Sequence, residues 1–467
     1  NIKKVKETSR TFKMAIVNSN TRLIVQERTD AFFPFLFLCL YMVLILVRPH
    51  EWLPQLQDLP VIRLSLLLAF FSYLVLQQDK KFPPQTLCCM LLVLVMLLSG
   101  IRNGWLGGGI TSANNFIISG VLPIIVFSGL TTTVARTRML MLIAIIAAMV
   151  MVNNGISQKN SSVGIGWAGS ALSWLDRITY VGFFNDPNDL GMFFVMTLPF
   201  VVLFFLQGGF VIKVISALSG AYILYGVYLT NSRGALVSLV AMAAVFSYLN
   251  WGKLKTVLTG LLLSPALIFI FMKFRSIDVD EESAAGRVDS WYEGMQLFFW
   301  RPILGVGQGN FLDYHHITAH NSYVLTLAEL GLSGYFLWMV FLLLTLYMVY
   351  PQRQLNTITL PTVPESFASY REQEAFTKQY NRVKAQKWYS DCMFYSMVGF
   401  AGTVFFLSRT YSVVGYVFAG IAIAQYYQVA KFTGLNPLPS LKNIMTRILW
   451  LTLLSIFVLL IAIRVML

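Results

Sequence analysis

The residue types best suited to chemistry gather in one polar segment, residues 284–334, between apolar stretches of the chain. It contains three of the four histidines and four notable charged residues: His315, His316, His320, Arg287, Arg301, Asp289 and Glu329. Histidine accepts protons near neutral pH, and arginine binds anions through charge-assisted hydrogen bonds. This combination indicates a site that balances negative charge and moves a proton.

His320 is the candidate base of this segment. It lies in HHITAHNSYVLTLAELG, shortly before an apolar span whose helix Asn321 or Ser322 is expected to cap. The alternative is an interfacial histidine satisfied by the backbone. His315 and His316 read as more exposed. The spacing HHxxxH lacks the HExxH pattern or a partner carboxylate, so we expect no metal site.

Arg233 is the candidate anion-binding residue outside this segment. It lies in LTNSRGALVS between two apolar spans, on the side where positive residues are otherwise scarce. The alternative is a side chain anchored at the membrane interface. Its polar neighbours favour a buried anion site, to which Arg177 from another loop could contribute.

Arg287 opens a second candidate element, GRVDSWYEGMQLFFW. Its apolar residues recur at helical spacing and predict a helix on the outer interface: Val288, Trp291, Met295, Phe298 and Phe299. Arg287 either binds an anion or pairs locally with Asp289, and Arg301 reads as a helix-end charge.

Two loops have structural interpretations. GVGQGN follows no strand and its third glycine comes too early for a dinucleotide motif, so we expect a tight, flexible turn between helices. NDPN, residues 185–188, reads as a turn, with Asn188 or Asp189 capping the next span.

The composition predicts an all-α, polytopic membrane protein. Of 467 residues, 57% are hydrophobic and 12% are charged, whereas soluble domains carry about 25% charged residues. The net charge of +14 comes from residues flanking the spans, so nucleic acid is not an expected partner. Cys39, Cys88, Cys89 and Cys392 read as small core residues.

Thirteen apolar stretches approach the length of a membrane span, or twelve if 86–101 is re-entrant. They are 32–48, 62–78, 86–101, 116–131, 138–154, 190–207, 211–230, 234–250, 255–273, 330–350, 391–407, 411–429 and 446–466. Most lysines and arginines fall on one side if residues 1–30 are cytoplasmic. Residues 31–467 then form one membrane-embedded domain. Its outer segments are 102–115, 155–189, 231–233 and 274–330, and 351–390 is an inner loop with a charged helix near Tyr370–Trp388. Residues 1–30 show no secretory signal.

These motifs together resemble the O-antigen ligase and polymerase superfamily. The resemblance covers about residues 180–345, through FNDPNDLG, NSRGA, GR…W…RPILGVGQGNF and AHNSYVLTLAELGLSG. RPHEW, at 48–52, is similar to a loop of some exopolysaccharide-cluster members. The resemblance implies a GT-C-type glycosyltransferase of the bacterial inner membrane. The enzyme implied by this resemblance would move a glycan from undecaprenyl diphosphate to an acceptor hydroxyl at the periplasmic face, without metal, nucleotide sugar or other cofactor.

The resemblance also assigns roles to residues. It implies that Arg233 and Arg287 are the essential arginines and that His320 is the essential histidine, acting as the base in an inverting displacement. A further arginine near the loop start is Arg275 or Arg177. The candidates for substrate binding are Arg177, Arg275, Asn188, Gln308 and Asn321.

The expected partners are the lipid-linked donor, membrane lipid and an acceptor, with a chain-length regulator as a further possibility. The acceptor is another glycan for a polymerase, and lipid A–core or a protein for a ligase. A transporter or flippase of lipid-linked glycans is the alternative of another class, although transporters often show inverted repeats. A purely structural subunit would leave Arg233 unexplained.

Overall fold

The described part of the chain is built of helices, with no extended structure beyond two isolated bridges. The structure is a computed structural model that describes residues 31–57, 59–262, 264, 282–350, 370–433 and 441–466. The helices are α2 (Phe32–Val47), α3 (Pro49–Trp52), α4 (Val61–Leu76), α5 (Pro84–Arg102), α6 (Leu106–Phe116), α7 (Leu122–Leu130), α8 (Val134–Asn160), α9 (Pro187–Gln207), α10 (Phe210–Thr230), α11 (Arg233–Trp251), α13 (Glu282–Trp300), α14 (Ser322–Val349), α16 (Tyr370–Thr403), α17 (Val413–Thr433) and α18 (Leu441–Met466). Single turns are η1 (Pro54–Leu56), η2 (Ile117–Val121), η3 (Trp174–Asp176), η4 (Gly182–Asn185) and η5 (Asn310–Asp313).

Nine of the described helices are long and apolar enough to cross a membrane. They are α5, the continuous helix Leu106–Leu130, α8, α9, α10, α11, α14, α17 and α18, and α2 and α4 are shorter apolar helices. The predicted polytopic, all-α fold is therefore confirmed. Residues 1–30, most of the predicted span 255–273 and residues 351–369 of the predicted inner loop lie outside the described residues.

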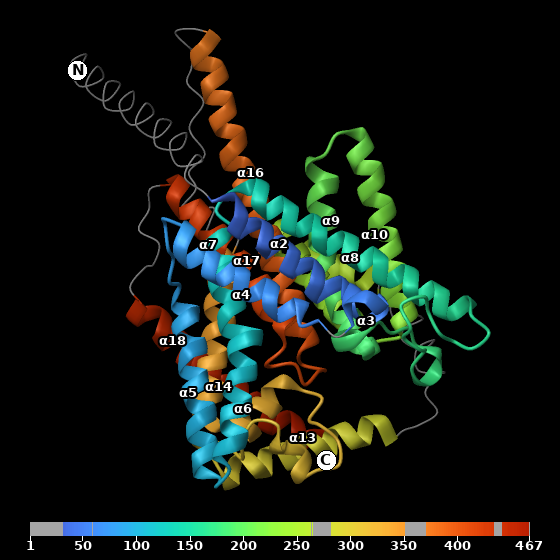
Figure 1. Cartoon of the computed structure of the whole chain (residues 1–467), viewed down its shortest axis with the longest axis vertical. Helices are drawn as coiled ribbons and strands as arrows, with labels where there is room; N and C mark the ends of the chain where they lie inside the picture. The colour runs from blue at the N-terminus through green and yellow to red at the C-terminus, as the bar shows by residue number, and fades with distance from the viewer. Residues whose placement is uncertain are drawn as a thin grey trace.

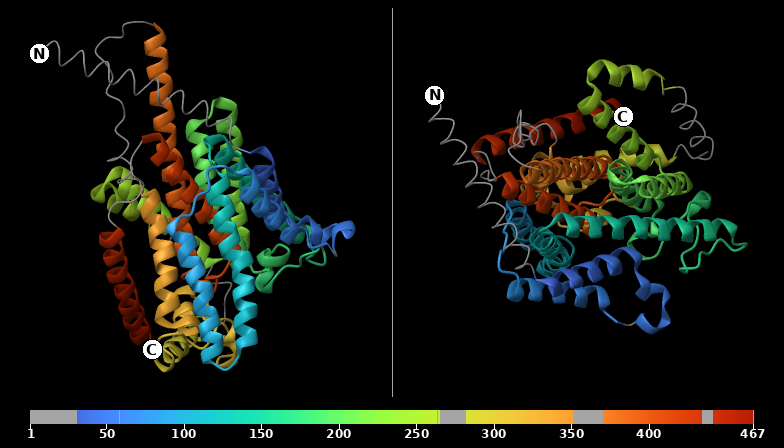
Figure 2. Two further views of the ribbon diagram at one scale, coloured as in Figure 1. Left: turned by 60° about the vertical axis from the view of Figure 1, so that its left-hand side comes forward. Right: turned by 90° about the horizontal axis from the view of Figure 1, so that it is seen from above.

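The helices differ in their direction and in how much of each helix is buried. Figure 1 shows α5, α6 and α14 along the long axis, with α2, α4 and α8 inclined to them. It also places α13 and the α5–α6 turn at one end and the start of α16 at the other. Figure 2 shows α18 at the periphery, which agrees with its low buried share of 22%, against 78% for α9 and 83% for α17. The core therefore lies around α9 and α17.

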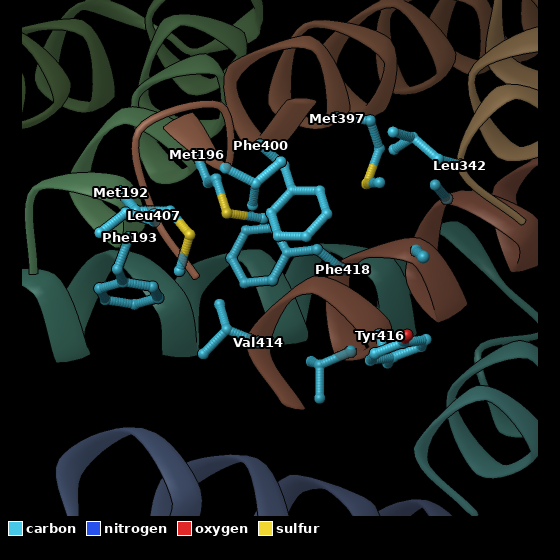
Figure 3. Close-up of a cluster of buried hydrophobic side chains, with 14 of the residues drawn as sticks. Met192, Phe193, Met196, Leu342, Met397, Phe400, Leu407, Val414, Tyr416 and Phe418 are labelled. Carbon is cyan, nitrogen blue, oxygen red and sulfur yellow. The ribbon is translucent and has the colours of Figure 1, made fainter. Parts of the chain in front are cut away.

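Aromatic and sulfur-containing side chains fill this core (Figure 3). They come from α9, α16 and α17, and include Met192, Phe193, Met196, Phe400 and Phe418. The rings of Phe200 and Phe418 stack with their centroids 5.4 Å apart. Lipid tails are as apolar as these side chains, so close packing is what holds the spans together. The start of α9 and the loop between α16 and α17 also contribute to the site described below.

The predicted outer loop 102–115 is wrong, because α6 already begins at Leu106. The link between α5 and α6 is short and holds only Asn103, Gly104 and Trp105. A Cβ atom on Gly100 would lie 2.7 Å from the Cα atom of Gly109, so glycine at both positions allows the two helices to touch. Small residues bring membrane helices together in this way. Because these small residues have low hydropathy, the sequence pattern missed the first part of the span.

Helix α14 is broken at Gly331, and the GVGQGN segment repairs the break. Gly331 has φ 62° and ψ −163°. The N–H groups of Val306 and Gly307 donate to the carbonyls of Ala328 and Glu329, at 3.0 and 2.9 Å, and the N–H of Leu332 donates to Pro302 at 2.8 Å. Irregular backbone at membrane depth requires such protein partners.

The glycines of GVGQGN explain this close approach. Gly305, Gly307 and Gly309 all have positive φ, which confirms the predicted tight turn. A Cβ atom on Gly305 would lie 2.2 Å from the carbonyl carbon of Glu329. The segment therefore packs directly on the backbone of α14, a role that the sequence interpretation missed.

Candidate functional site

Ser322, at the start of α14, joins two loops of the site. Its N–H donates to the carbonyl of Val404 at 2.9 Å, and its hydroxyl donates to the carbonyl of Leu407. The N–H of Arg409 donates back to the Ser322 hydroxyl at 2.8 Å. The loop that carries His320 is therefore fixed against the loop between α16 and α17.

The turn between α10 and α11 packs on the same region. A Cβ atom on Gly234 would lie 2.7 Å from the Cβ of Phe406 in the α16–α17 loop, and one on Gly191 would lie 2.8 Å from the Cβ of Ala235. These contacts bring the turn that holds Arg233, the start of α9 and the α16–α17 loop together.

Arg177 bridges the loop before α9 and the end of α10. Its Nε donates to the carbonyl of Thr230 at 2.9 Å, and its Nη2 donates to Oδ1 of Asn188 at 2.7 Å. The hydroxyl of Ser232 donates to the same Oδ1 at 2.8 Å. Arg177 and Asn188, both predicted substrate-binding residues, therefore hold the Arg233 turn in position.

The cap of α9 is Asp186, so the predicted cap at Asn188 or Asp189 is wrong. Oδ1 of Asp186 accepts from the N–H of Asn188 at 2.8 Å, and Pro187 takes the first helical position. Proline at that position loses no hydrogen bond, because the first N–H groups of a helix have no partner within it. Because Asp186 caps the helix, the side chains of Asn188 and Asp189 are available for contacts with other segments of the site.

Arg233 is the first residue of α11 and is half-buried. Asn231 adopts the left-handed conformation, with φ 48°, and ends α10. Ser232 then caps α11, its hydroxyl accepting from the N–H of Ala235. The turn therefore fixes the backbone on both sides of the arginine.

His320 has a strained backbone and a shifted pKa. Its φ is 45°, which is uncommon for a residue with a side chain. Burial is the main cause that lowers the pKa of His320 below 6.5; the charge of Arg287 comes next, with Arg409 acting in the same direction and Asp186 opposing. The imidazole is therefore neutral at pH 7 and able to accept a proton.

Helix α13, which carries Arg287, is anchored beside His320. The indole Nε1 of Trp291 donates to the carbonyl of Ala319 at 2.8 Å. The predicted apolar face is largely confirmed, since Trp291, Met295 and Phe298 are buried, but Phe299 is 57% exposed. The buried apolar face of α13 is the one that packs on α14, and it does not extend around the whole helix.

His315 contacts helix α13, through Asp289, rather than His320. Its Nε2 lies 3.1 Å from Oδ2 of Asp289, and its Nδ1 lies 2.9 Å from the carbonyl oxygen of Ile317. Its ring also packs on His316, with centroids 4.4 Å apart. Asp289, the predicted local partner of Arg287, thus bonds a histidine of the following loop.

Arg409 is a candidate that the sequence interpretation missed. Its Nε donates to Oδ1 of Asp189 at 2.6 Å, and its Nη2 donates to Oδ2, while the guanidinium lies 5.2 Å from the ring centroid of Phe183. Asp189 is fully buried and the Arg409 side chain is 34% exposed. A signal existed in the sequence: SRT at 408–410 places an arginine in a turn between two apolar stretches, as SRG does at 232–234.

The remaining predicted site residues lie in different places. Asn321 caps α14, its Oδ1 accepting from the N–H groups of Tyr323 and Val324 at 2.9 and 3.2 Å, so that expectation is confirmed. Gln308 lines a cavity beside Arg409. Arg275 lies outside the described residues. Within the described ranges no three His, Cys, Asp or Glu side chains could together hold a metal ion, and metal-free chemistry stays an expectation.

The RPHEW segment packs on the loop that leads into α9. The guanidinium of Arg48 pairs with Glu51 and covers Gly182, where a Cβ atom would lie 2.0 Å from Arg48 Nε. The hydroxyl of Tyr180 donates to the carbonyl of Val47 at 2.6 Å. This segment therefore helps to fix the loop that precedes α9.

Comparison with known proteins agrees with this geometry. Residues 218–339 match the family model described as O-antigen ligase. This range includes Arg233, Arg287 and His320. A search of curated proteins found no match. The chain is a multi-pass helical membrane protein, and its residues 218–339 are similar to the O-antigen ligase family.

Proposed function

We propose that the protein transfers a glycan from undecaprenyl diphosphate to an acceptor hydroxyl. The observation that carries this proposal is that the His320 loop is hydrogen-bonded to α13 through Trp291 and Ala319 and to Arg409 through Ser322. In this setting burial and the charges of Arg287 and Arg409 lower the pKa of His320, which favours the neutral imidazole. A proton acceptor beside two fixed cations suits a reaction in which an anion leaves while a hydroxyl attacks. The family match over residues 218–339 supports the same class of reaction.

The arginines would bind the diphosphate of the donor. Guanidinium groups form bidentate hydrogen bonds with phosphate oxygens and stay charged at every physiological pH. Arg233 and Arg287 are the proposed clamp, and Arg177 holds the Arg233 turn through Thr230 and Asn188. As the bond to the sugar breaks, charge grows on the diphosphate and these contacts strengthen.

His320 would act as the base. A ring nitrogen takes the proton of the acceptor hydroxyl while that oxygen forms a bond to the anomeric carbon. The bond between this carbon and the diphosphate oxygen breaks, and its electron pair leaves with undecaprenyl diphosphate. A single displacement of this kind inverts the anomeric configuration.

The site is proposed to face the periplasm in a bacterial inner membrane. The distribution of lysines and arginines supports this orientation, because the site segments fall on the side where positive residues are scarce. The acceptor is another lipid-linked glycan, lipid A–core or a protein. These acceptors correspond to a polymerase or a ligase.

The test uses purified protein in lipid with a defined lipid-linked oligosaccharide. Growth of the glycan indicates a polymerase, a single transfer to lipid A–core indicates a ligase, and movement across the membrane without a covalent product contradicts the proposal in favour of transport. His320→Ala should abolish transfer while leaving lipid binding in place. Loss of activity with EDTA that Mg²⁺ or Zn²⁺ restores would contradict the proposed metal-free chemistry.

A further inference from the structure

A polar cavity of about 320 Å³ lies beside Arg409, where the GVGQGN segment, α14 and the α16–α17 loop meet. Its polar lining residues are Gln308, Thr318, Glu329, Ser408, Arg409 and Tyr411. Small-ligand pockets span roughly 300–1,000 Å³. The cavity is at the lower end of that range and suits a single ring with its substituents rather than a whole oligosaccharide.

Buried oxygen acceptors dominate one wall of this cavity. Glu329 is 3% exposed, and its Oε1 accepts from the N–H of Gly309 at 2.9 Å. Its Oε2 makes no hydrogen bond of good geometry within the described residues, although Glu329 and Tyr411 interact electrostatically, and Oε1 of Gln308 likewise has no described partner. A buried acceptor without a donor costs about 1–3 kcal/mol. The wall is therefore suited to a ligand that offers several O–H donors.

The two charged residues that line the cavity favour different ligand groups. Arg409 is held by the buried Asp189 on one side and suits an anion. An ionised Glu329 carboxylate would repel a phosphate, and its oxygens accept hydrogen bonds from hydroxyls. The hydroxyls of Thr318 and Ser408 also line the cavity and bond each other at 2.8 Å. A neutral polyhydroxyl group fits this wall, and a phosphate attached to that group would lie toward Arg409.

The remaining walls are apolar. Phe311, Leu312 and Leu325 line the cavity, and Phe311 is almost fully buried. A pyranose ring presents C–H groups on its faces and hydroxyls at its edge. Aromatic and aliphatic walls next to carboxylate, amide and hydroxyl groups match both features.

We propose that this cavity binds one sugar ring adjacent to the diphosphate site, with Glu329 and Gln308 accepting hydrogen bonds from its hydroxyls. The inference rests on the proposed glycan transfer and adds where a sugar is held. The ring belongs either to the transferred glycan or to the acceptor. Both sources offer the same chemistry, and the experiment separates them.

The test compares binding of two lipids to the full chain in nanodiscs: undecaprenyl diphosphate alone, and the lipid-linked oligosaccharide extracted from the source cells. Glu329→Gln keeps an oxygen for the Gly309 N–H, and Gln308→Leu removes an Oε1 atom without a described partner. Each variant should leave binding of the sugar-free lipid within twofold and weaken binding of the glycan-bearing lipid by about tenfold.

The control variants are Glu293→Gln and Gln296→Leu on α13, which lie outside the cavity lining. They should bind both lipids as the unmodified protein does. If donor binding is unchanged but the acceptor KM rises about tenfold in the cavity variants, the cavity holds the acceptor sugar. If neither quantity changes, the inference is wrong while the proposed function stands. If the unmodified protein binds neither lipid, the proposed function is wrong and the inference with it.

Discussion

Arg409 and Asp189 form an ion pair although 220 positions separate them in the chain. The pair links the α16–α17 loop to the first turn of α9, and Arg409 also lines the polar cavity. A planar guanidinium that meets both carboxylate oxygens has one orientation. The buried carboxylate therefore directs the guanidinium toward the site.

Replacing Asp189 should show this dependence. Asp189→Asn removes the negative charge and leaves Arg409 without its bidentate partner, so we expect transfer to fall by about a hundredfold, with the larger part in kcat. Arg409→Gln should destabilise the fold by up to about 3 kcal/mol, since it leaves a buried carboxylate unpaired. Rate measurements and thermal unfolding in detergent check both. Activity of Asp189→Asn equal to that of the unmodified protein would contradict a positioning role.

The pH dependence of transfer should report His320. Because burial and Arg287 lower its pKa, kcat/KM should fall as pH decreases, with a midpoint below 6.5 where the imidazole becomes protonated. Arg287→Gln removes a positive charge near the ring and should move this midpoint upward while reducing activity. Arg102→Gln, an exposed arginine at the end of α5, is the control and should leave the midpoint unchanged. A midpoint that does not move in Arg287→Gln would separate Arg287 from His320.

Arg177→Lys should weaken the support of the Arg233 turn. Lysine keeps the charge but lacks the forked guanidinium that reaches both Thr230 and Asn188. We expect a stability loss of about 1–2 kcal/mol and a fall in transfer of about tenfold. Lys159→Ala, an exposed residue at the end of α8, should change neither. Full activity with normal stability in Arg177→Lys would argue against this support.

Gly305→Ala should disrupt the repaired break in α14. The new Cβ atom would lie 2.2 Å from the Glu329 carbonyl carbon, at a φ of 67°. We expect a loss of about 2 kcal/mol or more in stability, measured by thermal unfolding. Gly309→Ala separates the two causes, because Gly309 has φ 86° but no atom within 4 Å of the added Cβ; its cost should be about 1 kcal/mol. Equal losses in the two variants would show that packing on α14 contributes little.

Several features of the site could be predicted because they depend on residues close in sequence. The cap at Asn321 follows from its position before an apolar run. Arg233 and His320 stood out as polar groups at the ends of spans. The wrong cap at Asn188 and the wrong loop 102–115 share a cause, since each pattern permitted more than one local structure and distant contacts selected one.

The amino-acid sequence alone determined that the chain is a helical membrane protein, because hydropathy is a local property. It also proposed His320, Arg233 and Arg287 as candidate site residues from local motifs. Only the tertiary structure decided that Asp189 pairs with Arg409, that GVGQGN repairs α14 and that Gln308 and Glu329 share a cavity. Each of these contacts joins segments far apart in the chain. Their formation depends on how α9, α14, α16 and α17 pack, and no stretch of sequence encodes that packing by itself.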